Sequence, residues 1–132
     1  MKRKFMSSPN GSDLYERIAA ATAQAVSIAE ITLPPDVLEK IEAAAREETS
    51  PVARREYEHI LENIRLATQR KTPICQDTGI PVVYLTLPPQ VPLTAAISDA
   101  VRKGIRDATK QVPLRPNLVD PISRHNTRTN TS

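Results

Sequence analysis

The residues best able to do chemistry form one short run, Cys75-Gln76-Asp77-Thr78-Gly79. A thiol can act as a nucleophile or bind a metal, an amide can donate to a substrate oxygen, and a carboxylate can accept a proton or orient a donor. Gly79 allows a tight turn at the end of the run. Free cysteines are also often buried apolar fillers, and these five residues alone favour that simpler role for Cys75. The run therefore marks a candidate site without fixing its chemistry.

The two histidines offer a second route to catalysis, through a Cys–His pair. His59 lies on an otherwise ordinary predicted helix, and His125 lies in an irregular region near the last residues. Both are more typical of surface or helix-capping histidines than of a general base. A Cys–His hydrolase is therefore disfavoured.

The composition limits the class of protein. The chain has 132 residues, which suits one domain, and with three Tyr, one Phe and no Trp its core must be aliphatic. The net charge is +3, and acids and bases mix along the middle of the chain, unlike the dense basic face of a nucleic-acid-binding protein. No apolar run approaches the roughly 20 residues needed to span a bilayer. We therefore expect no nucleic acid and no membrane as partners.

The single cysteine and the first residues of the chain indicate the cellular compartment of the protein. One cysteine cannot form a disulfide within the chain and is typical of a reducing environment, so we expect a cytoplasmic protein. Residues 1–11 carry positive charge but lack the apolar stretch of a secretory signal. We expect them to form a disordered leader before a domain that covers residues 12–132.

Apolar residues at steps of three and four predict four helices. They cover residues 12 to about 28, 35 to about 48, 51 to about 69, and 94 to about 110. The third helix has the clearest start, because Ser50 can accept a bond from a free amide and Pro51 fits the first helical position. After about residue 110, several prolines exclude long regular elements.

One segment predicts a strand. Ile80–Leu87 is rich in β-branched residues, and Pro81 stands at its beginning, where a missing donor does least harm. A lone strand leaves backbone groups unpaired on both edges, and the chain offers no strong second strand. We infer that a further C-terminal portion or another chain completes the sheet. The expected fold is α+β and mostly helical, with about four helices and this short strand after the cysteine loop, as an incomplete domain.

Several segments together resemble one enzyme family. The run from Pro73 to Gly79 closely resembles the signature of class I, iron–sulfur-dependent fumarate hydratases, a family that includes L(+)-tartrate dehydratases. Further similar segments follow in the family's order: Leu33-Pro34-Pro35-Asp36-Val37, Leu61-Glu62-Asn63-Ile64, Leu114-Arg115-Pro116-Asn117-Leu118-Val119-Asp120-Pro121 and Asn126-Thr127. By this resemblance, residues 12–132 are the N-terminal portion of a truncated class I fumarase-type α domain.

The resemblance implies a [4Fe–4S] cluster held by three thiolates, of which Cys75 is one. Three protein ligands on four irons leave one iron open, and this iron acts as a Lewis acid on the hydroxyl and carboxylate of the substrate. The other two thiolates are implied to lie farther along the α subunit. A β subunit, or a C-terminal region of the same enzyme, is implied to supply further substrate contacts and the proton-abstracting residue. We therefore expect an oligomer, and neither cluster nor turnover from these 132 residues alone.

The resemblance also implies residues that bind the substrate. Gln76 and Asp77 adjoin the cluster ligand and are implied to contact the dicarboxylate or its hydroxyl, and Asp77 is the candidate catalytic residue. Arg115, in its Leu-Arg-Pro context, matches the family's substrate-binding arginine, and a guanidinium offers a carboxylate a fork of donors. The simpler alternative is a surface arginine held between prolines.

The Asn126-Thr127 segment is a weaker match. The family continues here with glycine, an acidic residue and asparagine, whereas this chain has Arg128-Thr129-Asn130. This departure leaves Asn126 and Asn130 with two open roles, lining the site or ordering a turn.

The leading hypothesis is a component of a hydro-lyase that interconverts fumarate and malate, a C4 dicarboxylate pair, by reversible hydration. Dehydration of L(+)-tartrate is the alternative within the family, and nothing in the sequence separates the two. A non-catalytic helical interaction module, with Cys75 as filler, is the alternative from another class.

Overall fold

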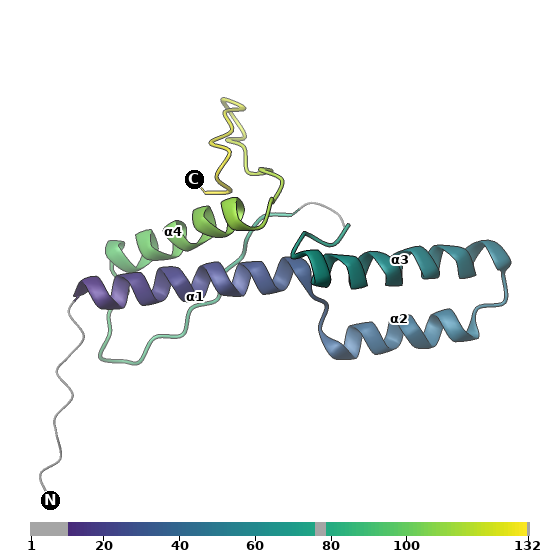
Figure 1. The fold of residues 1–132 in the computed structure, drawn as a ribbon. Helices are drawn as coiled ribbons and strands as arrows, with labels where there is room; N and C mark the ends of the chain where they lie inside the picture. Colours follow the sequence, from purple (N-terminus) through teal and green to yellow (C-terminus); the bar gives the residue numbers. More distant parts are fainter. Residues whose placement is uncertain (1–10, 76–78, 132) are drawn as a thin grey trace, which may run out of the picture.

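The computed structural model describes residues 11–75 and 79–131. These residues contain four α-helices: α1 (Gly11–Ile31), α2 (Pro35–Glu47), α3 (Pro51–Arg70) and α4 (Ala95–Gln111). Figure 1 shows α1 and α4 side by side, while α2 and α3 form an antiparallel pair that extends from the end of α1. Residues 1–10 of the expected leader lie outside the described residues, and Gly11 already begins α1.

The helix starts follow local rules of capping. Ser50 accepts a bond from the amide of Ala53 (3.5 Å), and Pro51 is the first residue of α3. Thr94 caps α4 in the same way, through the amide of Ile97 at 3.4 Å. The third helix ends at Arg70, and the next residue, Lys71, has a left-handed backbone (φ 54°) that stops the helical repeat.

The contact between α1 and α4 is built from small side chains. Ala19 and Ala23 of α1 are buried, as are Ala100 and Ala108 of α4. A Cβ atom on Gly104 of α4 would lie only 2.5 Å from the carbonyl oxygen of Ala19. The two backbones therefore approach too closely at this point for any side chain.

A second apolar cluster joins the helical pair to the cysteine loop. Ile64 and Ala67 of α3 are buried together with Ile74, which directly precedes Cys75. Leu33, from the segment between α1 and α2, and Leu38 and Ile41 of α2 pack against them. Burial of Ile74 therefore anchors the start of the loop to the end of α3.

The mostly helical character of the fold is confirmed, but the described residues do not confirm the predicted strand Ile80–Leu87. This segment has no assigned secondary structure. Within residues 11–75 and 79–131, the one ladder contact outside the helices is an isolated antiparallel bridge between Val119 and Asn126. A strand is defined by pairing with a neighbour, and none of the described segments pairs with this one. Its β-branched composition therefore produces an unpaired stretch.

Among the described residues, no helix combines the length and the apolar character needed to cross a membrane.

The close approach of the two backbones at Gly104 predicts that a side chain at this position destabilises the fold. Gly104→Ala places a methyl group against the backbone of α1, and the overpacking outweighs the roughly 1 kcal/mol by which alanine favours a helix. We expect the free energy of unfolding to fall by about 1–2 kcal/mol, measured by urea denaturation. Gly79→Ala is the matched control, because a Cβ at Gly79 meets no atom within 4 Å. Equal stability of the two variants would contradict the tight α1–α4 contact.

Candidate active site

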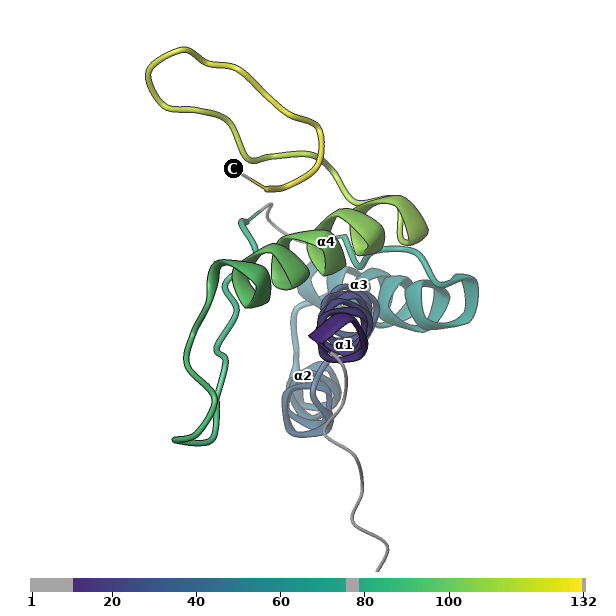
Figure 2. The ribbon, with the colours of Figure 1, turned by 90° about the vertical axis from the view of Figure 1, so that its left-hand side faces the viewer.

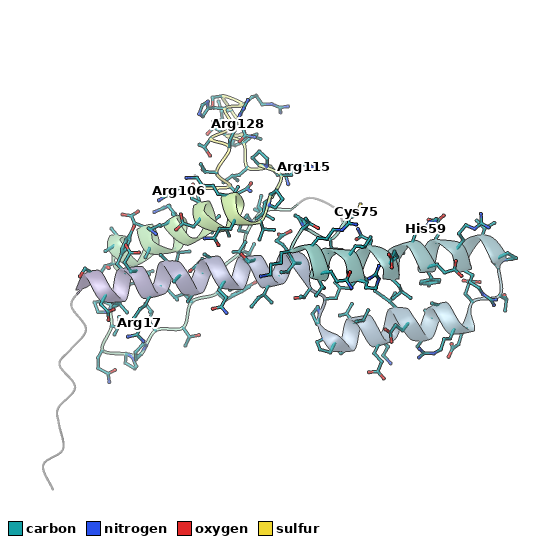
Figure 3. All side chains as sticks on the ribbon, in the orientation of Figure 1. Arg17, His59, Cys75, Arg106, Arg115 and Arg128 are labelled. Atoms are coloured by element: carbon teal, nitrogen blue, oxygen red, sulfur yellow. The ribbon has the colours of Figure 1, made fainter. Side chains whose placement is uncertain are left out.

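A hollow of about 490 Å³ opens where the loop after α3 meets the loop after α4. Its wall combines Glu30 from the end of α1, residues 73–75 and 79–81 from the first loop, and residues 113–115 and 117 with Asn130 from the second. Cys75 and Arg115 are therefore brought together from segments that are distant in sequence. Figure 3 shows both on the same side of the molecule, Cys75 next to the end of α3 and Arg115 next to the end of α4.

Cys75 is exposed rather than buried. The simple role of a buried apolar filler, which the five-residue run alone favoured, therefore does not fit this structure. Gln76 and Asp77 follow directly in the chain, but they lie outside the described residues, so their roles stay predictions.

The backbone at Cys75 is held by two hydrogen bonds. The side chain of Asn63, on α3, accepts a bond from the Cys75 amide with an Oδ1–N distance of 2.9 Å. One residue earlier, the Ile74 amide donates to the carbonyl oxygen of Glu30 at 2.9 Å. Helices α1 and α3 thus fix the thiol-bearing residue from two sides. The role of Asn63 was missed in the sequence, where its only signal was its place in the Leu61-Glu62-Asn63-Ile64 segment.

Arg115 is held by the far end of its own loop. The side chain of Asn130 donates to the carbonyl oxygen of Arg115 (3.2 Å) and accepts from the amide of Asn117 (2.9 Å). Asn130 is only 6% exposed and has a left-handed backbone, with φ 55°. Asparagine tolerates this conformation better than most residues. The segment in which the family resemblance was weakest therefore closes the loop that carries the arginine.

Asn126 orders the same loop without lining the hollow. Its side chain donates to the carbonyl oxygen of Pro116 (2.7 Å) and accepts from the amide of Arg128 (2.7 Å). Of the two roles left open for this residue, the described contacts support ordering of the turn. Figure 2 shows the loop as a long excursion beyond the end of α4.

The turn at Asp120 has a perturbed carboxylate. The amide of Ser123 (2.6 Å), the Ser123 hydroxyl (2.8 Å) and the amide of Ile122 (3.0 Å) all donate to Asp120. These bonds, with the Ser123 amide as the largest contributor, hold the pKa of Asp120 below its ordinary value. The turn is therefore tightest when this carboxylate is charged.

The two histidines take no part in the wall of the hollow. His59 is exposed and lies 3.9 Å from the carboxylate of Glu56 one helical turn earlier. His125 is exposed in the loop after α4. This arrangement agrees with the surface roles expected for both residues.

The described residues cannot complete a metal site by themselves. Among residues 11–75 and 79–131, no three His, Cys, Asp or Glu side chains gather closely enough to hold an ion. The whole sequence contains one cysteine, so it can supply one thiolate to a cluster. An exposed thiol at the wall of a hollow fits such a single ligand.

Comparison with known proteins identifies the family. Residues 19–132 match the family model described as fumarate hydratase (Fumerase). Because this match covers most of the chain, the protein belongs to the fumarate hydratase family, and the class I resemblance read from its motifs is confirmed.

Two curated relatives are both named as alpha subunits of an L(+)-tartrate dehydratase. The chain is 38% identical over 104 residues to a Methanocaldococcus jannaschii protein named "Putative L(+)-tartrate dehydratase subunit alpha", covering 77% of this chain and 36% of the relative. It is 26% identical over 127 residues to the L(+)-tartrate dehydratase subunit alpha of Escherichia coli K12, covering 96% of this chain and 42% of the relative. The chain thus spans well under half the length of these relatives.

The bond from Asn63 predicts how firmly the cysteine loop is held. Asn63→Ala leaves the Cys75 amide without its acceptor, and we expect a loss of about 1 kcal/mol of local stability. Hydrogen exchange at the Cys75 amide should become several-fold faster. Asn63→Asp is the control, because it keeps an acceptor oxygen in place and should retain slow exchange. Unchanged exchange in Asn63→Ala would show that the bond does not hold the loop.

The lowered pKa of Asp120 predicts a response to acid. A carboxylate with a depressed pKa in the folded protein contributes stability above its unfolded pKa and loses it as the pH falls through the folded pKa. The Ser123 amide should therefore shift in an NMR titration at a pH below that of an ordinary aspartate. Asp120→Asn keeps an acceptor but does not titrate, so this shift should disappear. A midpoint at or above the ordinary aspartate value would contradict the bonded turn.

Proposed function

We propose that this chain supplies one cluster ligand and part of the substrate pocket of a [4Fe–4S]-dependent hydro-lyase that interconverts fumarate and malate. The observation that carries the proposal is that Cys75 and Arg115 line the same hollow. Membership of the fumarate hydratase family supports the reaction class, the reversible addition of water across a carbon–carbon double bond. In hydration, the hydroxyl group joins one alkene carbon and a proton joins the other.

Arg115 suits a dicarboxylate because its guanidinium stays protonated and presents donors in a planar fork. Two parallel N–H···O bonds to a carboxylate fix both the position and the orientation of the substrate. Asn130 holds the backbone of Arg115, so the arginine is presented from an ordered loop. In the proposal, Arg115 binds one substrate carboxylate and thereby directs the reacting carbons toward the thiol side of the hollow.

Cys75 is the proposed ligand to the cluster, through its thiolate. When bound, the cluster would supply a Lewis-acidic iron for the hydroxyl of the substrate. Because the chain has one cysteine, the other two thiolates must come from outside these 132 residues. Gln76 and Asp77 are proposed to contact the substrate next to the ligand, and Asp77 to exchange a proton with it.

The partners follow from the relatives. The two relatives described above are named as alpha subunits, and we propose that this chain likewise works with a β subunit or an equivalent region, in an oligomer. An exposed free thiol favours a reducing compartment, so we place the enzyme in the cytoplasm.

L(+)-tartrate is the second candidate substrate, because the named relatives are tartrate dehydratase subunits. Malate and tartrate are both C4 dicarboxylates with a hydroxyl on the reacting carbon, so Arg115 and Cys75 would serve either. Parallel assays of the complete enzyme distinguish them. A higher kcat/KM for malate supports the leading hypothesis, and a higher value for L(+)-tartrate supports the alternative.

Arg115 gives the direct test of substrate binding. Arg115→Lys in the complete enzyme keeps the charge but removes the fork, and we expect KM for the dicarboxylate to rise about 10- to 100-fold, from the loss of a charge-assisted bond. Steady-state kinetics provides the measurement. Arg17→Lys is the matched control, since Arg17 forms an exposed pair with Asp13 (3.8 Å) near the beginning of α1. An unchanged KM in Arg115→Lys would remove Arg115 from the pocket.

A further inference from the structure

The segment Ile80–Leu87 has backbone groups that find no hydrogen-bond partner among the described residues. No backbone hydrogen bond joins it to any other described residue. Figure 1 shows the chain after the cysteine loop crossing α1 on its way to the start of α4, and residues 80–85 line a groove together with α1. Its backbone is uniformly non-helical, and four of its eight residues are β-branched. Unpaired backbone groups in a segment of this composition can pair with another strand.

The side chains of this segment alternate as they do in a β-strand. Ile80, Val82 and Tyr84 are 62%, 67% and 94% exposed, whereas the intervening Val83 and Leu85 are 40% and 43% exposed. A period of two is the signature of a strand with two distinct faces. Here both faces are apolar, which is typical of a strand covered on both sides in the complete fold.

A groove beside this segment has an apolar floor. The groove has a volume of about 550 Å³ and runs between residues 80–85 and the face of α1 that carries Ala21, Ala25 and Ala29. Ile28, on the same helix, is 51% exposed. A helix and an extended segment thus leave apolar surface open toward the same space. A second strand placed there would pair with the segment and cover the alanine face of α1.

We propose that Ile80–Leu87 becomes a β-strand in the complete protein by pairing with a strand from the part of the subunit outside these 132 residues. The length of the relatives supports this occupant: the chain corresponds to only 36% of the M. jannaschii protein and 42% of the E. coli protein. The incoming segment would be extended and apolar on the side that faces α1. This inference does not depend on the proposed substrate.

The proline in the segment indicates which edge pairs. In a strand, the N–H groups of alternate residues point to opposite edges. Pro81 has no N–H, so the edge that it shares with Val83 and Leu85 lacks one donor. The other edge, with the amides of Val82, Tyr84 and Thr86, keeps all its donors and is the edge assigned to the new strand.

Residue-resolved hydrogen exchange on the complete protein tests this assignment. The amides of Val82, Tyr84 and Thr86 should exchange at least about 100-fold more slowly than in an unstructured peptide. Exchange of all three at unstructured rates would overturn the proposal. The strand could instead come from a second copy of this chain. Protection that disappears on dilution, in parallel with dissociation of the copies, would assign it to that copy and also overturn the proposal.

A substitution at Tyr84 tests the proposed strand independently of hydrogen exchange. Tyr84→Ser in the complete protein should lower Tm by roughly 5 °C or more, because a side chain that is exposed here would be covered by the paired fold. Val52→Ser is the matched control: Val52 is 75% exposed in the first turn of α3, and its replacement should shift Tm by no more than about 2 °C. Equal shifts for the two variants would show that Tyr84 stays at the surface.

Discussion

The close approach of α4 to α1 is the constraint on which the rest of the structure depends. Gly104 leaves no side chain between the two backbones, so α4 lies directly on the buried small residues of α1. Each helix then holds one of the two loops that form the hollow. At the end of α1, the carbonyl of Glu30 accepts a bond from the amide of Ile74, and the end of α4 leads into the loop that carries Arg115. A shift of one helix against the other would therefore change the separation of the two candidate functional residues.

The site divides its tasks between residues that face the hollow and residues that hold them. Cys75 and Arg115 reach the open space, whereas Asn63 and Asn130 bond to the backbones beside them. Both asparagines use a side-chain amide to satisfy main-chain groups of irregular loops, which have no helical or strand partners of their own. This arrangement can present a thiolate and a guanidinium to the same small dianion. One thiolate is too few to hold the proposed cluster, so in this proposal the remaining ligands come from outside these 132 residues.

What could be predicted from the sequence was local. The helix starts at Ser50 and Thr94 follow from caps that lie within three residues of the amides they serve. The strand Ile80–Leu87 could not be predicted reliably, because a strand requires a partner that composition does not reveal. The bonds of Asn63 and Asn130 were equally hidden, since each joins residues more than ten positions apart. The meeting of Cys75 and Arg115 was expected only through the family resemblance, because no local pattern links two such distant loops.

The most direct measurement of the central claim is the iron and sulfide content of the complete enzyme with Cys75→Ala, prepared without oxygen and compared with the unaltered enzyme. If the Cys75 thiolate holds the cluster, the visible absorption of the iron–sulfur centre and the bound iron should fall to a small fraction, while the helical circular dichroism is retained. A variant that keeps a full, stable four-iron cluster would contradict the account.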